Sequence, residues 1–483
     1  MRRAWLTLFV AAGIVVDAAP VHDTSAIRTR SKIVRHFTPA DQLSNRYQYI
    51  PFDVPQGSGT LRVSYRYDGA AGENVIDLGL FEPGPLDLGT RAFRGYSGGS
   101  KPSLVISPTE TTPGYRPGPL PAGQWHVLLG LYKVGEAGVD VTIDIGIEEG
   151  SSARAVSGLV NRRRSQPPAG GAAAPPRWYK GALHTHTLHS DGTVTPAALM
   201  EQFRKATFDF VAITDHNNAT HQYELAPQHK EGASPLWIIG EEVTTPGGHA
   251  SVWGLDAEQW VDFRVSPKDG RISEIVAAAH RYGALFSINH PASDCVACGW
   301  THPLVDGIDA IEISNGRHGE VDNALAMWDR LLRSGRRITG VGSSDWHRPP
   351  TPIDDANVRV YASALTEEAV LAAIRGGHVI VMRNGRDVTP EIVFRSGTRT
   401  ARVGESLELA SGSDLRIEVN AVGLGGAHLA VILNGTRAAQ AILDPLGAAR
   451  VEHAAAPGYV RVELRAADGQ PFALTNPVYL VAP

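Results

Sequence analysis

The sequence contains only two cysteines among its 483 residues, Cys295 and Cys298. Two thiolates are too few for a closed zinc site built from four cysteines. A redox role for the pair would need a thioredoxin-like context, which the surrounding sequence lacks. In an oxidising compartment the two side chains could form a disulfide that stiffens their loop, and we prefer this interpretation to free thiols.

An excess of charge of one sign is also absent, because the formal net charge is −5 over the whole chain. A protein that binds nucleic acid without metal ions needs a basic patch or stripe that attracts the phosphate backbone. The near balance of charges provides no such field. We therefore expect no nucleic-acid partner.

One short apolar run stands near the start of the chain, over residues 4–16, directly after two arginines. It is too short to span a bilayer but has the length of a signal-peptide core. Small residues that suit cleavage end at Ala18, and Pro20 would fit poorly directly after a cut at Ala19. We predict a signal peptide over residues 1–18, with an uncleaved or atypical signal as the alternative. The expected location is periplasmic or extracellular, with no integral membrane span after processing.

The length and a hydrophobic content of 43% allow three domains with ordinary cores. Residues 36–150 alternate apolar and polar positions between clusters of Gly, Pro and Asp, which predicts a β-sandwich. Residues 151–177, rich in Arg, Pro, Ala and Gly, are interpreted as a linker. Residues 388–483 alternate again and predict a second β-sandwich-like domain. The flanking domains either pack against the central domain and shape its mouth, which we prefer, or bind carbohydrate or a cell surface.

The central block, residues 178–387, alternates strand and helix patterns. Thr195 is a good N-cap and Pro196 a good first residue for a helix over residues 196–205. An apolar strand over 208–214 follows, and further helices are predicted over 272–282 and 323–334. This order gathers the carboxyl ends of successive strands at one end of the domain.

Potential metal ligands stand at those strand ends. The segment that begins His184-Thr-His186 and ends at Asp191 follows an apolar lead-in, and residues two apart on an extended segment point to the same side. Each later apolar run also ends in carboxylates or imidazoles, namely Asp215 and His216, Glu241 and Glu242, His249, His290, and Asp345 and His347. Singly, each such piece is as well explained by a capped turn or the end of an element, but together they predict a multinuclear metal site.

The order and spacing of these motifs resemble the PHP superfamily, the polymerase and histidinol phosphatase type of metal-dependent phosphoesterase. The family pattern HxHTxxSDG is matched from His184 to Gly192. The resemblance implies a distorted (β/α)7 barrel, an α/β fold, over the central block. It also implies nine metal ligands: His184, His186, Asp191, His216, Glu242, His249, His290, Asp345 and His347.

The resemblance further implies a division of these ligands among two or three divalent ions. A first ion would take His184, His186, Glu242 and Asp345, a second Glu242, His249 and His290, and a third Asp191, His216 and His347. Glu242, Asp345 and His347 are the expected catalytic residues. Mixed nitrogen and carboxylate donors suit Zn, Mn or Fe, and the sequence does not choose among these metals.

Several neighbours of the motifs receive other interpretations. Glu241 competes with Glu242, but the family spacing Gly-x-Glu selects Glu242, so we expect Glu241 to face solvent or support a ligand. Asp215 is expected to be a partner that orients a ligand histidine. The side chains expected at the surface or in structural roles are His189, His221, His229, His318, His378, Arg317 and Arg348. As an alternative, Arg317, Arg348 and His318 could contact a substrate anion or protonate a leaving group.

The resemblance implies a secreted metal-dependent hydrolase, first of all a phosphoesterase acting on a small phosphomonoester or diester. In such a site the metals would lower the pKa of a bridging water and neutralise phosphoryl oxygens. A secreted chain with a β domain before the barrel is also similar to the carbaryl-hydrolase-like branch, so a carbamate or ester substrate is the alternative. A non-catalytic metal-binding barrel is a further alternative, whose expected mark, lost ligands, is not seen here.

Overall fold

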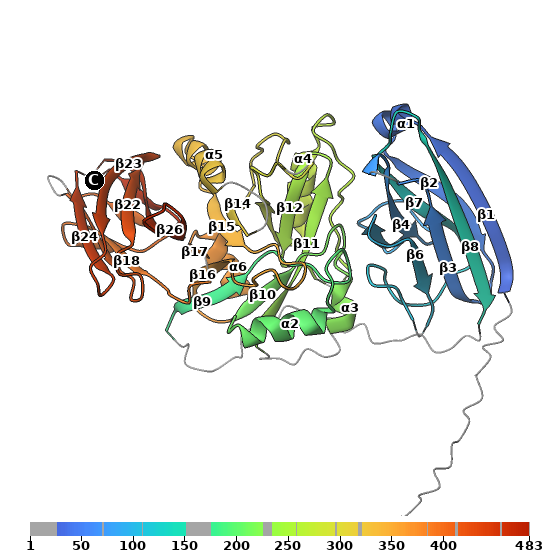
Figure 1. Cartoon of the computed structure of the whole chain (residues 1–483), viewed down its shortest axis with the longest axis horizontal. Helices are drawn as coiled ribbons and strands as arrows, with labels where there is room; N and C mark the ends of the chain where they lie inside the picture. Colours follow the sequence, from blue (N-terminus) through green and yellow to red (C-terminus); the bar gives the residue numbers. More distant parts are fainter. Residues whose placement is uncertain are drawn as a thin grey trace, which may run out of the picture.

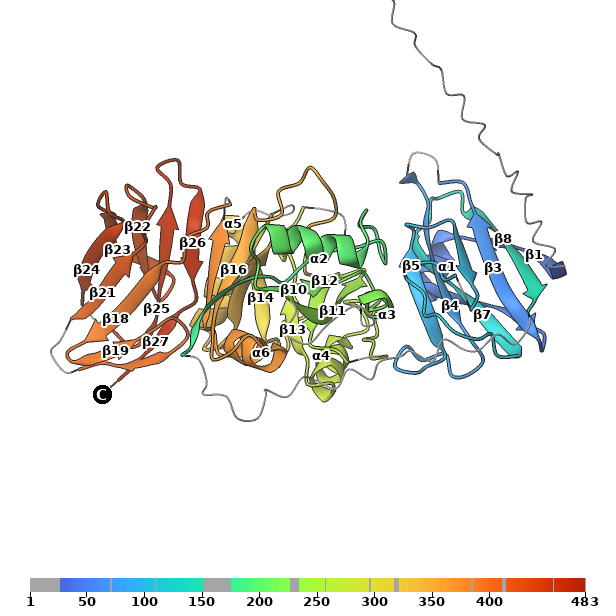
Figure 2. The ribbon, with the colours of Figure 1, turned by 90° about the horizontal axis from the view of Figure 1, so that it is seen from below.

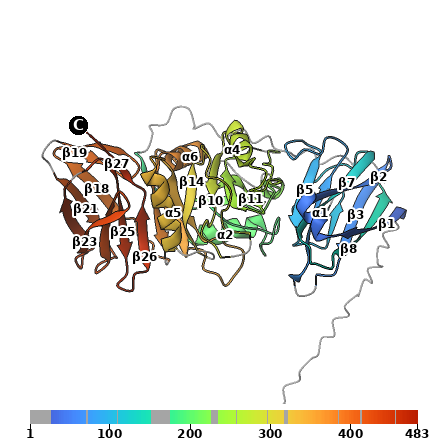
Figure 3. The same cartoon turned by 90° about the horizontal axis from the view of Figure 1, so that it is seen from above.

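The computed structural model describes residues 27–482, except 70–71, 109, 151–174, 226–233, 257, 295–296, 317–320, 384, 411–413 and 455. The predicted signal peptide and nearly all of the predicted linker therefore lie outside the described residues. Three bodies follow one another in chain order along the long axis of the molecule (Figure 1). The same order is visible from below and from above (Figure 2 and Figure 3).

The N-terminal body is a sandwich of two four-stranded antiparallel sheets. One sheet has the order β1 (Ile27–Phe37), β8 (Val139–Glu149), β3 (Ser58–Arg66) and β6 (Ser103–Ile106). The other has the order β2 (Tyr47–Val54), β7 (Gly123–Lys133), β4 (Val75–Phe81) and β5 (Phe93–Gly98), and a short helix α1 (Pro39–Ser44) precedes β2. Buried and exposed positions alternate along β8, so its apolar side chains enter one core between the sheets. The sandwich begins by Ile27 rather than at residue 36 as predicted, because β1 pairs with β8 along its length.

The central body contains nine described strands and five described helices. The strands are β9 (Arg177–Ala182), β10 (Phe210–Ile213), β11 (Leu236–Thr245), β12 (Gly248–Trp253), β13 (Leu285–Ile288), β14 (Ala310–Asn315), β15 (Thr339–Ser343), β16 (Ala356–Ala362) and β17 (Val379–Arg383). The helices are α2 (Pro196–Lys205), α3 (His221–Leu225), α4 (Ile272–Arg281), α5 (Val321–Arg333) and α6 (Glu367–Arg375). The hydroxyl of Thr195 caps α2 by accepting from Ala198 N, and Pro196 is its first residue, as predicted.

The mixed α/β class is confirmed, whereas a closed (β/α)7 barrel is not. Strands β9 to β11 and β13 to β15 are parallel, but β12 is antiparallel to both of its neighbours. The physical reason is the two-residue turn Pro246-Gly247, which joins β11 and β12 as a hairpin and leaves no length for a crossover helix. Strands β16 and β17 add an antiparallel edge beside β9.

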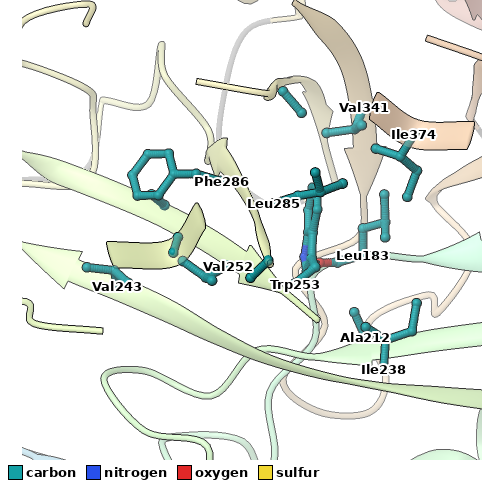
Figure 4. Close-up of a cluster of buried hydrophobic side chains, with 14 of the residues drawn as sticks. Leu183, Ala212, Ile238, Val243, Val252, Trp253, Leu285, Phe286, Val341 and Ile374 are labelled. Carbon is teal, nitrogen blue, oxygen red and sulfur yellow. The ribbon is translucent and has the colours of Figure 1, made fainter. Parts of the chain in front are cut away.

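The two ends of this curved sheet meet without a ladder between β15 and β17 in the described part of the chain. Ser343 Oγ, at the end of β15, instead accepts from the backbone N–H groups of Leu183 and His184 at 3.2 and 3.0 Å. Trp253 fills the interior and donates from Nε1 to Leu183 O at 2.8 Å (Figure 4). The residues that carry the predicted ligands therefore stand on a packed core.

The C-terminal body is again two layers of strands. One sheet has the order β19 (Arg399–Ala401), β18 (Glu391–Ser396), β21 (Leu415–Asn420) and β24 (Ala448–His453). The second layer contains β26 (Pro471–Thr475), β25 (Gly458–Arg465), β22 (His428–Leu433) and β23 (Thr436–Ile442), with β20 (Ser406–Glu408) and β27 (Val478–Val481) at its side. Because β26 pairs with β17, this layer continues the central sheet.

Both flanking bodies are packed against the centre. At the C-terminal junction, the buried guanidinium of Arg461 binds both carboxylate oxygens of Asp329, at 3.0 and 2.6 Å. At the N-terminal junction, ring centroids of Phe93 and Trp260 lie 4.8 Å apart, and those of Tyr96 and Phe263 lie 4.7 Å apart. The flanking domains thus pack on the central domain, as the preferred interpretation holds, whereas a role in shaping its mouth stays a prediction.

Two further sequence predictions concern cysteine and membranes. Cys298 is disulfide-bonded, while the other cysteine of the chain, Cys295, lies outside the described residues. Among the helices that the structure describes, none combines the length and the apolar character needed to cross a bilayer.

Candidate metal centre

All nine predicted ligands come from one end of the central sheet. His184, His186 and Asp191 follow β9, His216 follows β10, and Glu242 lies on β11. The hairpin returns His249 at the start of β12 to the same end, and the remaining ligands, His290, Asp345 and His347, follow β13 and β15. Parallel strands that end at one edge bring such side chains together, as the sequence pattern implied.

Two of these residues have backbone conformations that most residue types avoid. The φ angle is +25° at His290 and +50° at Asp345. Left-handed backbone at non-glycine residues costs of the order of 1–3 kcal/mol and is found most often at functional sites. The surrounding contacts hold the two side chains in place at this cost.

Glu242 is the centre of the cluster. Its two carboxylate oxygens lie within 3.5 Å of ring nitrogens from five imidazoles. These are His216 at 2.8 Å, His184 at 3.1 Å, His249 and His290 at 3.3 Å, and His186 at 3.5 Å. A carboxylate with this many neighbours on both oxygens has the position of a ligand shared between ions.

The other two carboxylates lie on either side of His186. Asp345 Oδ1 is 3.0 Å from His186 Nε2 and 3.3 Å from His184 Nε2. Asp191 Oδ1 is 3.2 Å from His347 Nε2 and 3.7 Å from His216 Nε2. Asp345 therefore lies beside two histidines of the predicted first ligand group, and Asp191 beside two of the predicted third, while the division of the ligands among ions stays a prediction.

Four overlapping sets of these side chains have donor atoms within 4.8 Å of one another. They are His186, Asp191, His216 and His347; His184, His186 and Glu242; His184, His290 and Asp345; and His216, Glu242 and His249. The donors also suit a metal chemically. Within the described part of the chain, His186 Nε2 and both ring nitrogens of His249 are buried and make no hydrogen bond. Cations that coordinate these nitrogens would satisfy them, so the cluster could hold divalent ions.

The pKa shifts differ among the ligands: those of His186, His249 and Glu242 favour the form that binds metal, whereas His216 holds a proton that a metal would have to displace. Burial lowers the pKa of His186 and of His249 to about 4, which keeps both imidazoles neutral, the form that binds metal. Burial would raise the pKa of Glu242, but the surrounding histidines hold it well below its usual value. Burial would lower the pKa of His216, but the carboxylates of Glu242 and Asp191 raise it to about 9.

Asp215 holds the loop that carries the first ligands. Its carboxylate accepts from Thr187 N and Thr187 Oγ1 at 2.8 Å each, and from Ser190 Oγ at 2.7 Å. His221 Nδ1 lies 3.2 Å from the same carboxylate. Asp215 was expected to orient a ligand histidine, but it binds the loop between two ligands, His186 and Asp191.

Two residues of the site were missed by the sequence analysis. Glu312, buried on β14, lies 3.2 Å from His184 Nδ1 and accepts from His290 N at 2.7 Å, so it supports two ligands. Asn289 donates from Nδ2 to Glu242 Oε1 at 2.8 Å. The signal available for Glu312 was a carboxylate within the apolar run Ala310–Asn315, where a charge needs a buried partner.

The remaining predictions have mixed outcomes. Glu241 does not face solvent: it is buried, and Oε2 accepts from Val261 N at 2.8 Å. His189 and His221 are buried, so a structural role holds for both and a surface role for neither. His378 contacts Val403 O at 2.9 Å, and the side chain of Arg348 is exposed. Three others, His229, His318 and Arg317, lie outside the described residues.

No family model matches the chain, and no curated protein matches it. Among solved structures, it is similar to a two-domain protein of Bacteroides vulgatus described as containing a PHP-like metal-dependent phosphoesterase. That match has 17% identity, a TM-score of 0.39, and covers 66% of this chain and 99% of the other.

Two further structures are a metal-dependent phosphoesterase of Bifidobacterium adolescentis and an amidohydrolase of Chromobacterium violaceum. The first has 18% identity and a TM-score of 0.29, and covers 37% of this chain and 92% of the other. The second has 15% identity and a TM-score of 0.26, and covers 36% and 89%.

Proposed function

We propose that this protein is an exported metal-dependent hydrolase of the PHP type that cleaves small phosphomonoesters or diesters. The observation that carries the proposal is the position of Glu242, whose carboxylate lies within 3.5 Å of five imidazoles. Nine donor residues, Glu242 included, are more than a single structural ion needs, because closed structural sites use about four ligands. Zn, Mn and Fe all suit this donor set.

The residues of the chain would each have a distinct task. Glu242 would be a ligand shared between ions. Asp345 would hold an ion together with His184 and His186, and Asp191 with His347 would hold another. Bound metals would supply an activated water and neutralise the oxygens of the attacked phosphoryl group. Asp215 and Glu312 would keep the ligands oriented, since each binds the backbone or the side chain of ligand-bearing loops.

The open side of the cluster supports access by a small molecule. The side chain of Asp191 is 44% exposed, whereas those of Glu242, His184 and His186 are at most 1% exposed. A substrate would therefore approach at Asp191 and at His216, whose side chain is 25% exposed, with the more buried ligands behind them. A formal net charge of −5 also favours a small anion over a long polyanion.

The test is elemental analysis of the exported protein, coupled to hydrolysis of three probes: p-nitrophenyl phosphate, bis-p-nitrophenyl phosphate and a naphthyl carbamate. Two or three metals per chain with turnover of a phosphate ester is the expected result. Preference for the carbamate would show that the substrate is a carbamate or ester rather than a phosphate ester, while the proposed metal centre would stand. Bound metal without turnover of any probe would favour a non-catalytic barrel, and a protein that takes up no metal after reconstitution would overturn the proposal.

A further inference from the structure

The N-terminal sandwich touches the loop that carries Asp191. In the turn between β5 and β6, Ser100 Oγ and Lys101 Nζ donate to the same acceptor, Ser190 O, at 3.0 and 2.9 Å. Gly114 N–H donates to His189 Nδ1 at 3.2 Å. The two residues directly before Asp191 are therefore held by a different domain from the one that carries the other ligands.

The contact at Gly114 is close enough to demand glycine. Its φ is +98°, and a Cβ at this position would lie 2.9 Å from His189 O and 3.0 Å from Tyr96 O. Any larger residue would have to move one of these backbone carbonyls. The sandwich and the ligand loop thus meet backbone to backbone.

The position of Asp191 depends on this support. It is the most exposed of the three carboxylates in the cluster, at 44% of its side chain against 4% for Asp345 and 1% for Glu242. Burial does little to fix such a side chain, so its place is set by its main chain. Asp215 holds the loop from within through Ser190 Oγ, and the sandwich holds it from outside through Ser190 O.

The sandwich is itself well anchored. Phe93 and Tyr96, on β5, belong to the hydrophobic cluster of the central body. Arg264 of the central body donates from Nη1 to Leu86 O of the sandwich at 2.9 Å. The turn that carries Ser100 and Lys101 follows β5 directly, so the aromatic contacts fix the turn as well.

We infer that the N-terminal sandwich completes the metal centre, with Ser100, Lys101 and Gly114 as positioning residues that keep Asp191 facing His216 and His347. Partners that orient metal ligands typically change metal affinity 10–100-fold when they are removed. This inference deepens the proposed function and rests on its metal binding, but it makes no use of the substrate.

The experiment is a double-mutant cycle in the full-length protein, read by titration of the metal-free protein with Zn²⁺ and with Mn²⁺. The variants are Ser100→Ala/Lys101→Met, Asp191→Asn and their combination. We expect the Ser100/Lys101 variant to bind metal about 10–100-fold more weakly at one class of site in each titration. In the Asp191→Asn background the same change should have no further effect, because both changes act on one ligand.

Controls separate positioning from loss of charge or folding. Lys32→Met removes an exposed ammonium from β1, in the other sheet of the sandwich, and should leave metal affinity unchanged. Ser100→Ala/Lys101→Arg keeps a donor near Ser190 O and should restore most of the affinity. Gly114→Ala disturbs the same loop through His189 and should lower the metal affinity of the same class of site.

The inference is overturned if the Ser100/Lys101 variant binds Zn²⁺ and Mn²⁺ with the affinities of the unaltered protein. It is also overturned if the Ser100/Lys101 change still lowers metal affinity in the Asp191→Asn background. Either result leaves the proposed function intact, because the cluster would still bind metal. An unaltered protein that binds no metal would overturn the proposed function and the inference together.

Discussion

Asp215 Oδ2 accepts a hydrogen bond of 2.8 Å from the hydroxyl of Thr187, although the two residues follow different strands. The same carboxylate also accepts from Thr187 N and from Ser190 Oγ, and it is buried without exposed surface. The loop between His186 and Asp191 is thus shaped by a residue beside the ligand His216. The pair links the first two ligand-bearing loops of the site.

Replacing Asp215 with Ala should therefore harm both stability and metal binding. Thr187 N–H and two hydroxyls would lose their acceptor in a buried place, which should lower the free energy of unfolding by about 3 kcal/mol. Metal affinity should fall about 10–100-fold, because the loop is no longer held. Urea unfolding and metal titration measure the two effects. Asp53→Ala, at an exposed position on β2, is the control and should change neither quantity.

Much of the site was predictable because its signals are local in sequence. Ligands at strand ends follow from the order of apolar runs, and all nine predicted residues lie in one cluster. Helix α2 was predicted to the residue, because Thr195 and Pro196 are start signals that act without tertiary contacts. The assignment of ligands to ions stays a prediction.

What was missed depends on contacts between distant segments. Glu312 is marked in the sequence only as a carboxylate within an apolar run, and Asn289 is not marked at all, so only the fold shows that they contact His184 and Glu242. Glu241 was expected to face solvent or support a ligand, but the loop that contains Val261 covers it. The antiparallel β12 and the shared layer of β17 and β26 likewise depend on pairing that a local pattern does not encode.

The neighbours Glu241 and Glu242 provide a matched pair of variants. They alternate on β11, so Glu242 faces the cluster while Glu241 faces Val261. Glu242→Gln removes a negative ligand and should weaken metal binding by about 100-fold or more and abolish hydrolysis. Glu241→Gln should be mild, because burial raises the pKa of Glu241 to about 8 and the group is a neutral acid at pH 7. Metal content that is lost in Glu241→Gln and kept in Glu242→Gln would show that the assignment is reversed.

Asp77 should make the stability of the sandwich depend on pH. Burial raises its pKa to about 6, against the lowering effects of the Tyr96 hydroxyl, which donates at 2.6 Å, and of Arg46 and His216. The folded protein therefore holds this proton more tightly than the unfolded chain does. Between about pH 4 and pH 6 the folded state is protonated while the unfolded state is ionised, so stability falls as the pH rises through this window.

The comparison with Asp77→Asn isolates this contribution, because the amide keeps an acceptor for Tyr96 and does not titrate. The unfolding free energy of the unaltered protein, relative to that of the variant, should fall by about 2–3 kcal/mol between pH 4 and pH 7. Urea unfolding in the presence of a chelator, at a series of pH values, measures the difference. A difference that stays constant with pH would mean that Asp77 titrates normally in the folded protein.

Asn476 should decide whether the C-terminal domain and the central sheet unfold together. Its buried side chain accepts from Gly340 N at 2.7 Å and donates to Gly340 O and Val379 O at 2.7 and 2.9 Å, so it joins β15 and β17 to the C-terminal layer. Asn476→Ala removes the side-chain partner of Gly340 N–H and Gly340 O and one of the two donors to Val379 O, and should lower the unfolding free energy by about 2–4 kcal/mol. Asn420→Ala, at an exposed end of β21, is the control and should cost less than about 0.5 kcal/mol. Because Gly340 lies on the strand that leads to Asp345, Asn476→Ala should also weaken metal binding. A variant that is destabilised but binds metal normally would show that the two domains are energetically independent.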